Sequence, residues 1–329
     1  ELNDSMNKIT MEDNAKLIDQ LKDKYQELKK EIAGKIIGQS DVVDKVLISI
    51  LSNGHCLLIG VPGLAKTLLV TAISETLALK YSRIQFTPDL MPSDIIGTEI
   101  LDNNKEFKFI KGPLFANIIL ADEINRTPPK TQSALLEAMQ ERKITAAGVT
   151  RDLEQPFFVL ATQNPIEQEG TYPLPEAQLD RFMFSVTLDY PSFEEEVSIV
   201  QNTTGAGLRD LNKILDGKEI MKYQEVIRMM PVSNHITEYA VKLTAKTRPG
   251  KPGAHPLAEK YLNWGAGPRA SQFLIAGAKT YAAIQGKYAP DIEDIKYVAE
   301  PILRHRIFKN YKAEAERVSI ESLIQEFLK

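Results

Sequence analysis

The sequence contains a single cysteine, Cys56, among its 329 residues. An intrachain disulfide is therefore excluded, and a chain so poor in cysteine is typical of a reducing compartment. The chain also lacks any run of the roughly 20 apolar residues that a membrane-spanning helix needs. Its first residues are charged and carry no apolar core of a signal peptide, so we expect a cytoplasmic location.

An excess of positive charge is also lacking, since 44 acidic and 40 basic residues give a net charge of −4. Binding to nucleic-acid phosphates usually needs a basic face, so nucleic acid is not expected as a partner. The few histidines have no ligand-like spacing, so we expect no zinc site at His55, His235, His255 or His305. The length and the 43% hydrophobic content suffice for two domains, each with its own core.

Short apolar runs recur between residues 56 and 188, with helical or loop segments between them: CLLIG, RIQFT, NIILAD, FFVLAT and FSVTL. This alternation predicts an α/β fold with an open sheet whose strands are buried on both faces. Apolar residues spaced by three or four predict earlier helices over 11–33 and 41–51.

After residue 191 the pattern changes to helices without convincing strands, at 193–201, 223–230, 233–246, 269–285, 291–304 and 316–328. We therefore predict an N-terminal helical segment (1–33), an αβα domain (34–191) and an all-helical domain (192–329).

A glycine-bearing loop lies between the first predicted strand and a helical stretch, and it can bind phosphate. Its backbone N–H groups and the helix N-terminus attract anions. The Lys66 amine can reach β- and γ-phosphates, and the Thr67 hydroxyl can bind Mg²⁺. Ala65 replaces the usual glycine before the lysine, which is acceptable if it already lies in the helix's first turn. The predicted nucleotide-binding residues here are Gly60, Val61, Pro62, Gly63, Leu64, Ala65, Lys66, Thr67 and Leu68.

Two later strands also end in polar side chains. NIILAD ends at Asp122 and is followed by Glu123, and FFVLAT is followed by Gln163 and Asn164. In a parallel sheet the carboxyl ends of strands open into the ligand crevice. We therefore predict that Asp122 and Thr67 hold Mg²⁺, that Glu123 activates the attacking water, and that Asn164 contacts the γ-phosphate. Together these patterns predict ATP hydrolysis.

The ordered set of motifs resembles the MoxR family of AAA+ ATPases, in the helix-2-insert branch, over roughly residues 30–310. The stretches that carry it are IIGQ, GVPGLAKT, ILADEINR, ATQNP, LPEAQLDRF, GAGPRAS and ILRHRI. The resemblance implies a P-loop αβα domain with a five-stranded parallel sheet, followed by an all-helical lid, with ATP between them. It also implies a ring of identical subunits, a hexamer when ATP is bound.

The resemblance assigns roles to further residues. Ile37 and Gly38 would contact adenine, and Asn164 matches sensor 1. Arg269 matches sensor 2 and would face phosphate from the lid. Arg181 matches the arginine finger that reaches a neighbouring subunit's γ-phosphate.

Two insertions fit the same branch. Strand-like stretches flank turns in one candidate hairpin over 98–110 and in a second over 143–153. In a ring, such insertions would face the central channel or the substrate.

The resemblance implies a chaperone-like motor that remodels or matures protein complexes. Its partners would be a protein client and a von Willebrand factor A (VWA) domain protein, and its work can include metal-cofactor insertion. One alternative is a magnesium-chelatase-type motor subunit. Another is a nucleic-acid motor, against which the lack of a basic domain counts.

Overall fold

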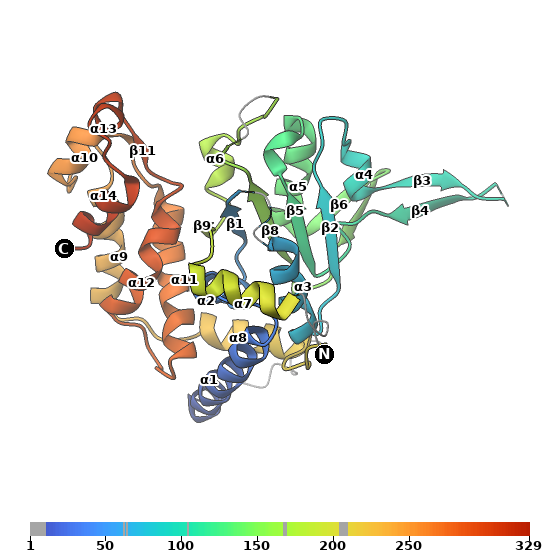
Figure 1. Ribbon diagram of the computed structural model, residues 1–329, viewed down its shortest axis with the longest axis horizontal. Coiled ribbons are helices and arrows are strands. Elements are labelled where there is room, and N and C mark those ends of the chain that lie inside the picture. Colours follow the sequence, from blue (N-terminus) through green and yellow to red (C-terminus); the bar gives the residue numbers. More distant parts are fainter. Residues whose placement is uncertain (1–10, 62, 64, 104, 167–169, 204–209) are drawn as a thin grey trace, which may run out of the picture.

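The computed structural model describes residues 11–61, 63, 65–103, 105–166, 170–203 and 210–329. Its centre is a parallel five-stranded sheet with the order β2–β5–β8–β1–β9 (Figure 1). The strands are β1 (Cys56–Ile59), β2 (Tyr81–Gln85), β5 (Ile118–Asp122), β8 (Phe158–Gln163) and β9 (Phe184–Thr187). Each coincides with one of the five apolar runs, so the predicted sheet is confirmed.

The two faces of the sheet pack against different helices. Leu57 of β1 faces a core that includes Leu135 and Met139 of α5 (Pro129–Glu141). Cys56 and Leu58, which alternate with Leu57, face the core formed by α2 (Ser40–Leu51) and α3 (Lys66–Thr76). Alternate residues of one strand therefore enter two cores, which is why these strands are apolar throughout.

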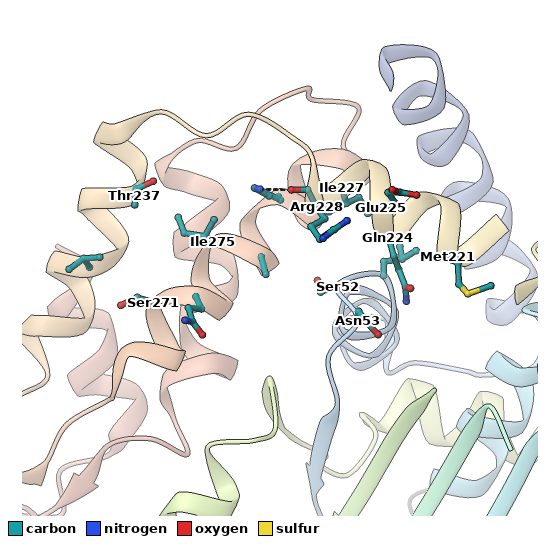
Figure 2. A pocket seen from close by; sticks show the side chains of 15 residues that line it. Ser52, Asn53, Met221, Gln224, Glu225, Ile227, Arg228, Thr237, Ser271 and Ile275 are labelled. Carbon is teal, nitrogen blue, oxygen red and sulfur yellow. Dashed lines mark hydrogen bonds between the residues drawn. The ribbon is translucent and has the colours of Figure 1, made fainter. Parts of the chain in front are cut away.

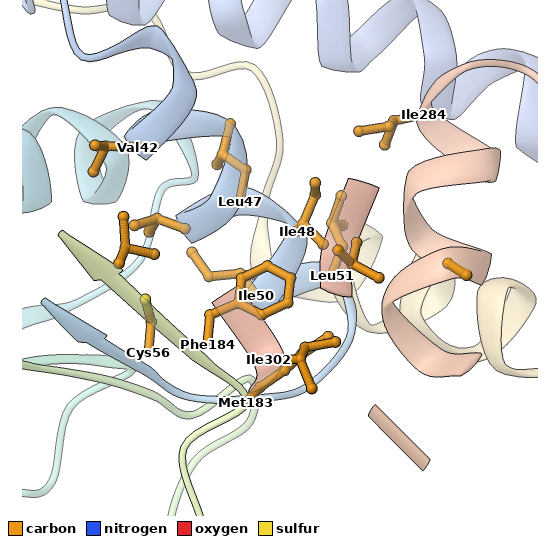
Figure 3. Packing of buried hydrophobic residues seen from close by; sticks show 14 of the residues in the cluster. Val42, Leu47, Ile48, Ile50, Leu51, Cys56, Met183, Phe184, Ile284 and Ile302 are labelled. Atoms are coloured by element: carbon orange, nitrogen blue, oxygen red, sulfur yellow. The ribbon is translucent and has the colours of Figure 1, made fainter. Parts of the chain in front are cut away.

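Helix α2 connects the sheet to the C-terminal helices. Its residues Ile48 and Leu51 share a buried cluster with Phe184 of β9 (Figure 3). The same cluster contains Ile284 of α11 (Pro268–Ile284) and Ile302 of α12 (Ile292–Leu303). The sheet and the C-terminal helices thus share one continuous core.

Other helices overlap the predicted ones, namely α1 (Met11–Ala33), α7 (Phe193–Thr203), α8 (Gly217–Arg228), α9 (Asn234–Lys246) and α14 (Ile320–Phe327). The short helices α10 (Pro256–Tyr261) and α13 (Tyr311–Ala315) were not predicted. The expectation of no strand after residue 191 is wrong at one place, where β10 (Leu262–Trp264) pairs antiparallel with β11 (Phe308–Lys309). Strands of three and two residues are too short to show a period in sequence. The domain limits at residues 34 and 192 stay a prediction.

Both predicted hairpins are confirmed. Strand β3 (Gly97–Leu101), which follows α4 (Pro92–Ile96), pairs with β4 (Phe107–Lys111), and together they extend away from the body (Figure 1). Strand β6 (Lys143–Ala146) pairs with β7 (Val149–Asp152). Their orientation toward a channel stays a prediction. Among the described residues, no helix has the length and apolar character needed to span a membrane.

Candidate functional site

The loop between β1 and α3 depends on glycine at two positions for different reasons. A Cβ on Gly60 would lie 2.8 Å from the Leu188 Cβ, so the close packing requires glycine. Gly63 has φ +84°, and a Cβ there would meet no atom of the described residues within 4 Å, so glycine serves the backbone conformation. Pro62 and Leu64, two of the predicted binding residues, lie outside the described residues.

Ala65 does not lie in the first turn of α3, as the sequence interpretation required. It is the N-cap residue and has left-handed backbone angles, φ 55° and ψ 28°. For a residue with a Cβ, this conformation is about 1–2 kcal/mol less favourable than the right-handed one. The alanine is thus accommodated with strain, and the first-turn explanation is wrong.

Lys66 begins α3 and its amine lies close to the loop it follows. The Nζ atom donates a hydrogen bond to the Gly60 carbonyl at 2.8 Å. Burial lowers the pKa of Lys66, while the negative charges of Asp122 and Glu123 act in the opposite direction. The lysine is therefore near both acids, although they follow a different strand. Thr67 and Leu68 continue the first turn, and the Thr67 side chain is exposed.

The two acids at the end of β5 are held by neighbours that the sequence interpretation missed. Asp122 accepts hydrogen bonds from Thr162 Oγ1 and from Arg83 Nη2, both at 2.7 Å. Glu123 Oε2 accepts from Gln85 Nε2 at 3.1 Å and from Arg126 Nη1 at 3.0 Å. Each acid is held in a defined direction by these bonds.

A signal for two of these partners was present in the sequence. Arg83 and Gln85 alternate along the apolar run RIQFT, so both point to the same face of β2. Because β2 is paired with β5, with Gln85 opposite Asp122, they lie beside the acids.

Asn164 follows β8, the strand between β5 and β1. Its side chain is buried, and its Oδ1 accepts a hydrogen bond from the Ile166 backbone N–H at 3.1 Å. Three neighbouring strands thus bring Lys66, Asp122, Glu123 and Asn164 to one edge of the sheet, as predicted. We call this the carboxyl edge.

Ile37 and Gly38 lie in the turn before α2. Gly38 has φ +69°, and a Cβ there would lie 2.7 Å from the carboxyl carbon of Glu195 in α7. The start of α7 therefore packs on the turn, and only glycine fits at residue 38 without movement.

The two predicted arginines lie at the other end of the strands. Arg181 follows α6 (Glu176–Leu179) and precedes β9, whose Phe184 is paired with Cys56, the first residue of β1. Arg269, which we expected to face phosphate from the lid, lies in the first turn of α11, and its Nη1 donates to Asp180 Oδ2 at 3.2 Å. The structure does not place Arg269 at the loop of its own chain. The length of strand β1, about 13 Å, separates Arg181 and Arg269 from the residues of the carboxyl edge.

A small cavity of about 170 Å³ joins the two arginines and is lined by Arg142, Arg181, Arg269, His55 and Phe273, among others. Within the described residues, the Arg181 guanidinium makes no hydrogen bond or ion pair. Arg142 instead donates to the Phe157 and Asn53 carbonyls. We call this end of the sheet the amino edge. Its cations have room to bind an anion.

A cavity of about 890 Å³ lies elsewhere, between α8, α9, α11 and the end of α2 (Figure 2). Its wall includes Met221, Val241 and Ile275, and none of the predicted site residues that the structure describes lines it. Lys279 in this wall donates to the Arg228 carbonyl at 2.8 Å and so completes the C-terminus of α8. This cavity therefore lacks the chemistry predicted for the phosphate site.

Comparisons with known proteins agree with this geometry. The chain matches the family described as "ATPase family associated with various cellular activities (AAA)" over residues 55–184, and the AAA lid domain over residues 255–327. It is 43% identical to the protein named Chaperone MoxR1 of Mycobacterium tuberculosis, covering 91% of this chain and 79% of that protein.

Protein MoxR of Methylorubrum extorquens is 29% identical, with 91% of this chain and 92% of that protein covered. A crystal structure of a candidate ATPase from Cytophaga hutchinsonii superposes with a TM-score of 0.88 at 42% identity. That likeness covers 95% of this chain and 96% of the other.

Proposed function

Because the chain belongs to the MoxR family of AAA+ ATPases, we propose that it binds ATP with Mg²⁺ at the carboxyl edge. We propose further that it hydrolyses ATP to ADP and phosphate. The observation that carries this is the gathering of Lys66, the two acids and Asn164 beside a loop that begins a helix. Such loops bind phosphate through N–H groups and the helix dipole.

The residues at this edge fit a triphosphate with magnesium. The Lys66 amine would bind β- and γ-phosphate oxygens in place of the Gly60 carbonyl it now contacts. The Thr67 hydroxyl and the Asp122 carboxylate supply the oxygen ligands that Mg²⁺ prefers. Each Asp122 oxygen accepts one described hydrogen bond, which leaves lone pairs for a water-mediated contact. When bound, the metal neutralises charge on the transferred phosphoryl group.

Glu123 is the residue we assign to the attacking water. Gln85 and Arg126 hold its carboxylate, and Thr162 Oγ1 accepts a hydrogen bond from its backbone N–H at 2.9 Å. An anchored carboxylate can accept the proton of a water as that water attacks phosphorus. Asn164, an uncharged amide at the end of the next strand, would contact the γ-phosphate without competing for the metal.

Arg181 and Arg269 would complete the site of a neighbouring subunit. The distance along the sheet keeps them from the phosphate loop of their own chain, and the Arg181 guanidinium has no hydrogen-bond or ion-pair partner among the described residues. An arginine that reaches a developing phosphate charge from another chain is a known device in NTPases. This supports a closed ring of identical subunits, a hexamer with ATP, since head-to-tail contacts close into rings.

The ring would use hydrolysis to remodel or mature protein complexes. A relative at 43% identity is named a chaperone, which supports work on proteins. A VWA-domain partner, metal-cofactor insertion and a cytoplasmic location are finer parts of the same proposal. Because the net charge is −4, DNA at physiological salt should leave the ATPase rate unchanged.

The test compares two variants in ATP binding and in steady-state hydrolysis with Mg²⁺. Glu123→Gln should keep ATP affinity while turnover falls about 10²–10⁴-fold, because only the proton acceptor is lost. Lys66→Ala should weaken ATP binding about 10- to 100-fold, because a charged hydrogen bond to phosphate is removed. Unchanged turnover in Glu123→Gln would contradict its assigned role, and a wild type without Mg²⁺-dependent hydrolysis would contradict the function.

A further inference from the structure

Asp180 is the point at which three distant parts of the chain meet. One carboxylate oxygen, Oδ2, accepts from Arg269 Nη1 of α11 at 3.2 Å. The other, Oδ1, accepts from Arg306 Nε at 2.8 Å. Asp180 is also the residue directly before Arg181. The Asp180 carboxylate thus joins Arg269 to Arg306, one residue away from Arg181 in the chain.

Arg306 is itself fixed in place. Its side chain is only 2% exposed, and its pKa is lowered to about 10 by burial, against the opposing effect of Asp180. The guanidinium donates to the Asp180 carbonyl at 2.8 Å, to the Phe182 carbonyl at 2.7 Å and to the Met183 carbonyl at 3.2 Å. It therefore binds the backbone on both sides of Arg181.

We propose that Asp180 is a positioning residue for ATP hydrolysis. Its carboxylate holds the Arg269 side chain in a fixed position relative to Arg181, and the buried Arg306 holds that carboxylate in place. This inference rests on the proposed function, since it assigns the means by which the amino edge presents its two arginines to a neighbour's phosphates. The residue itself touches no reacting atom.

A purely stabilising ion pair is the alternative, and the geometry argues against it. Arg306 already holds residues 180–183 through three backbone carbonyls, so the loop does not need the second carboxylate oxygen. Arg269 is 39% exposed, and an ion pair so accessible to water contributes little to stability. What the pair does fix is the direction of a long, flexible side chain. A misplacement of about 1 Å at a reacting site can lower a rate about 100-fold.

Asp180→Asn is the test variant, because it preserves size and removes the charge that holds two guanidinium groups. We expect kcat to fall about 10- to 100-fold, with KM for ATP nearly unchanged, because the nucleotide is bound at the carboxyl edge of another subunit. Glu321→Gln is the matched control. It makes the same chemical change in the nearby Arg304–Glu321 pair, which does not contact Asp180, and it should keep wild-type activity.

A mixing experiment separates a positioning role from misfolding. Lys66→Ala has a defective carboxyl edge but an intact amino edge, so it should restore hydrolysis when mixed with Asp180→Asn. Asp180→Asn mixed with Arg181→Ala should stay inactive, because both lesions lie at the amino edge.

Wild-type kcat in Asp180→Asn would overturn the positioning role and leave the proposed function intact. The positioning role would also be overturned if Lys66→Ala restored hydrolysis when mixed with Arg181→Ala but not when mixed with Asp180→Asn. If Lys66→Ala restores neither variant, the site between subunits is refuted and the positioning role is refuted with it.

Discussion

The two edges of the sheet differ in how they are assembled. The carboxyl edge joins residues from the ends of three strands, namely Lys66 after β1, Asp122 and Glu123 at the end of β5, and Asn164 after β8. It carries acids and a cation that act on one another. The amino edge joins Arg181, through Asp180, to Arg269 of α11 and to Arg306, which follows α12. Its cations have space beside them.

The difference shows that each edge contains what the other lacks. In the proposed function the carboxyl edge binds phosphates and orients a water, and none of the described arginines of the amino edge reaches it within the chain. The amino edge has arginines suited to phosphate. Among the described residues, no acidic side chain forms an ion pair with Arg181. Two copies in head-to-tail contact would combine the halves.

The largest expected effect is at Arg181. Arg181→Ala should lower kcat on the order of 10³–10⁵-fold, the range seen when such an arginine is lost from other NTPases. ATP affinity should change little, because binding depends on the carboxyl edge. The measurement is steady-state hydrolysis together with nucleotide binding. A purified variant with wild-type kcat would remove the amino edge from the reaction.

Acid should lower the stability of the folded protein through His55, which lies at the amino edge. Its Nδ1 accepts from the Val159 N–H at 3.0 Å, and its Nε2 faces the Met139 carbonyl at 3.1 Å, so the folded protein needs the neutral ring. Burial, helped by the charge of Arg142, lowers the pKa of His55 from 6.5 to about 3. The unfolded chain therefore binds the proton first as pH falls. The stability due to the neutral ring is complete above pH 6.5 and is lost progressively from pH 6.5 toward pH 3.

This loss is about 1.4 kcal/mol per pH unit, or about 2 kcal/mol at pH 5. Urea unfolding of wild type and of His55→Gln, at several pH values between 5 and 6.5, checks it. The variant is less stable throughout, but its unfolding free energy should fall less steeply with acid. Equal slopes in the two proteins would refute the lowered pKa.

The smallest effect belongs to the carboxyl edge. Ala65→Gly should raise the free energy of unfolding by about 0.5–1 kcal/mol, because glycine adopts the left-handed conformation without strain. Ala72→Gly in the same helix is the control and should destabilise by at least about 1 kcal/mol. Urea denaturation measures both. Destabilisation by Ala65→Gly as large as that of the control would contradict the strain assigned to Ala65.

The sequence predicted one edge far better than the other. The five strands, and hence the meeting of Lys66 with Asp122, followed from apolar runs and the geometry of parallel sheets. The left-handed backbone of Ala65 could not be predicted, because a single dihedral depends on how the whole loop closes. The partners of Asp180 could not be predicted either. Arg269 and Arg306 lie 89 and 126 residues away in sequence, and no local pattern encodes such a contact.

The most direct test of two half-sites uses Lys66→Ala and Arg181→Ala, at an ATP concentration that saturates the wild type but lies well below the weakened affinity of Lys66→Ala, so that each variant alone is nearly inactive. Mixed in equal amounts, they should form some contacts in which an intact carboxyl edge meets an intact amino edge. In random assembly about a quarter of all subunit contacts combine two intact edges, so hydrolysis should return toward about a quarter of the wild-type rate. A mixture as inactive as its components, despite proven co-assembly, would contradict a site shared between subunits.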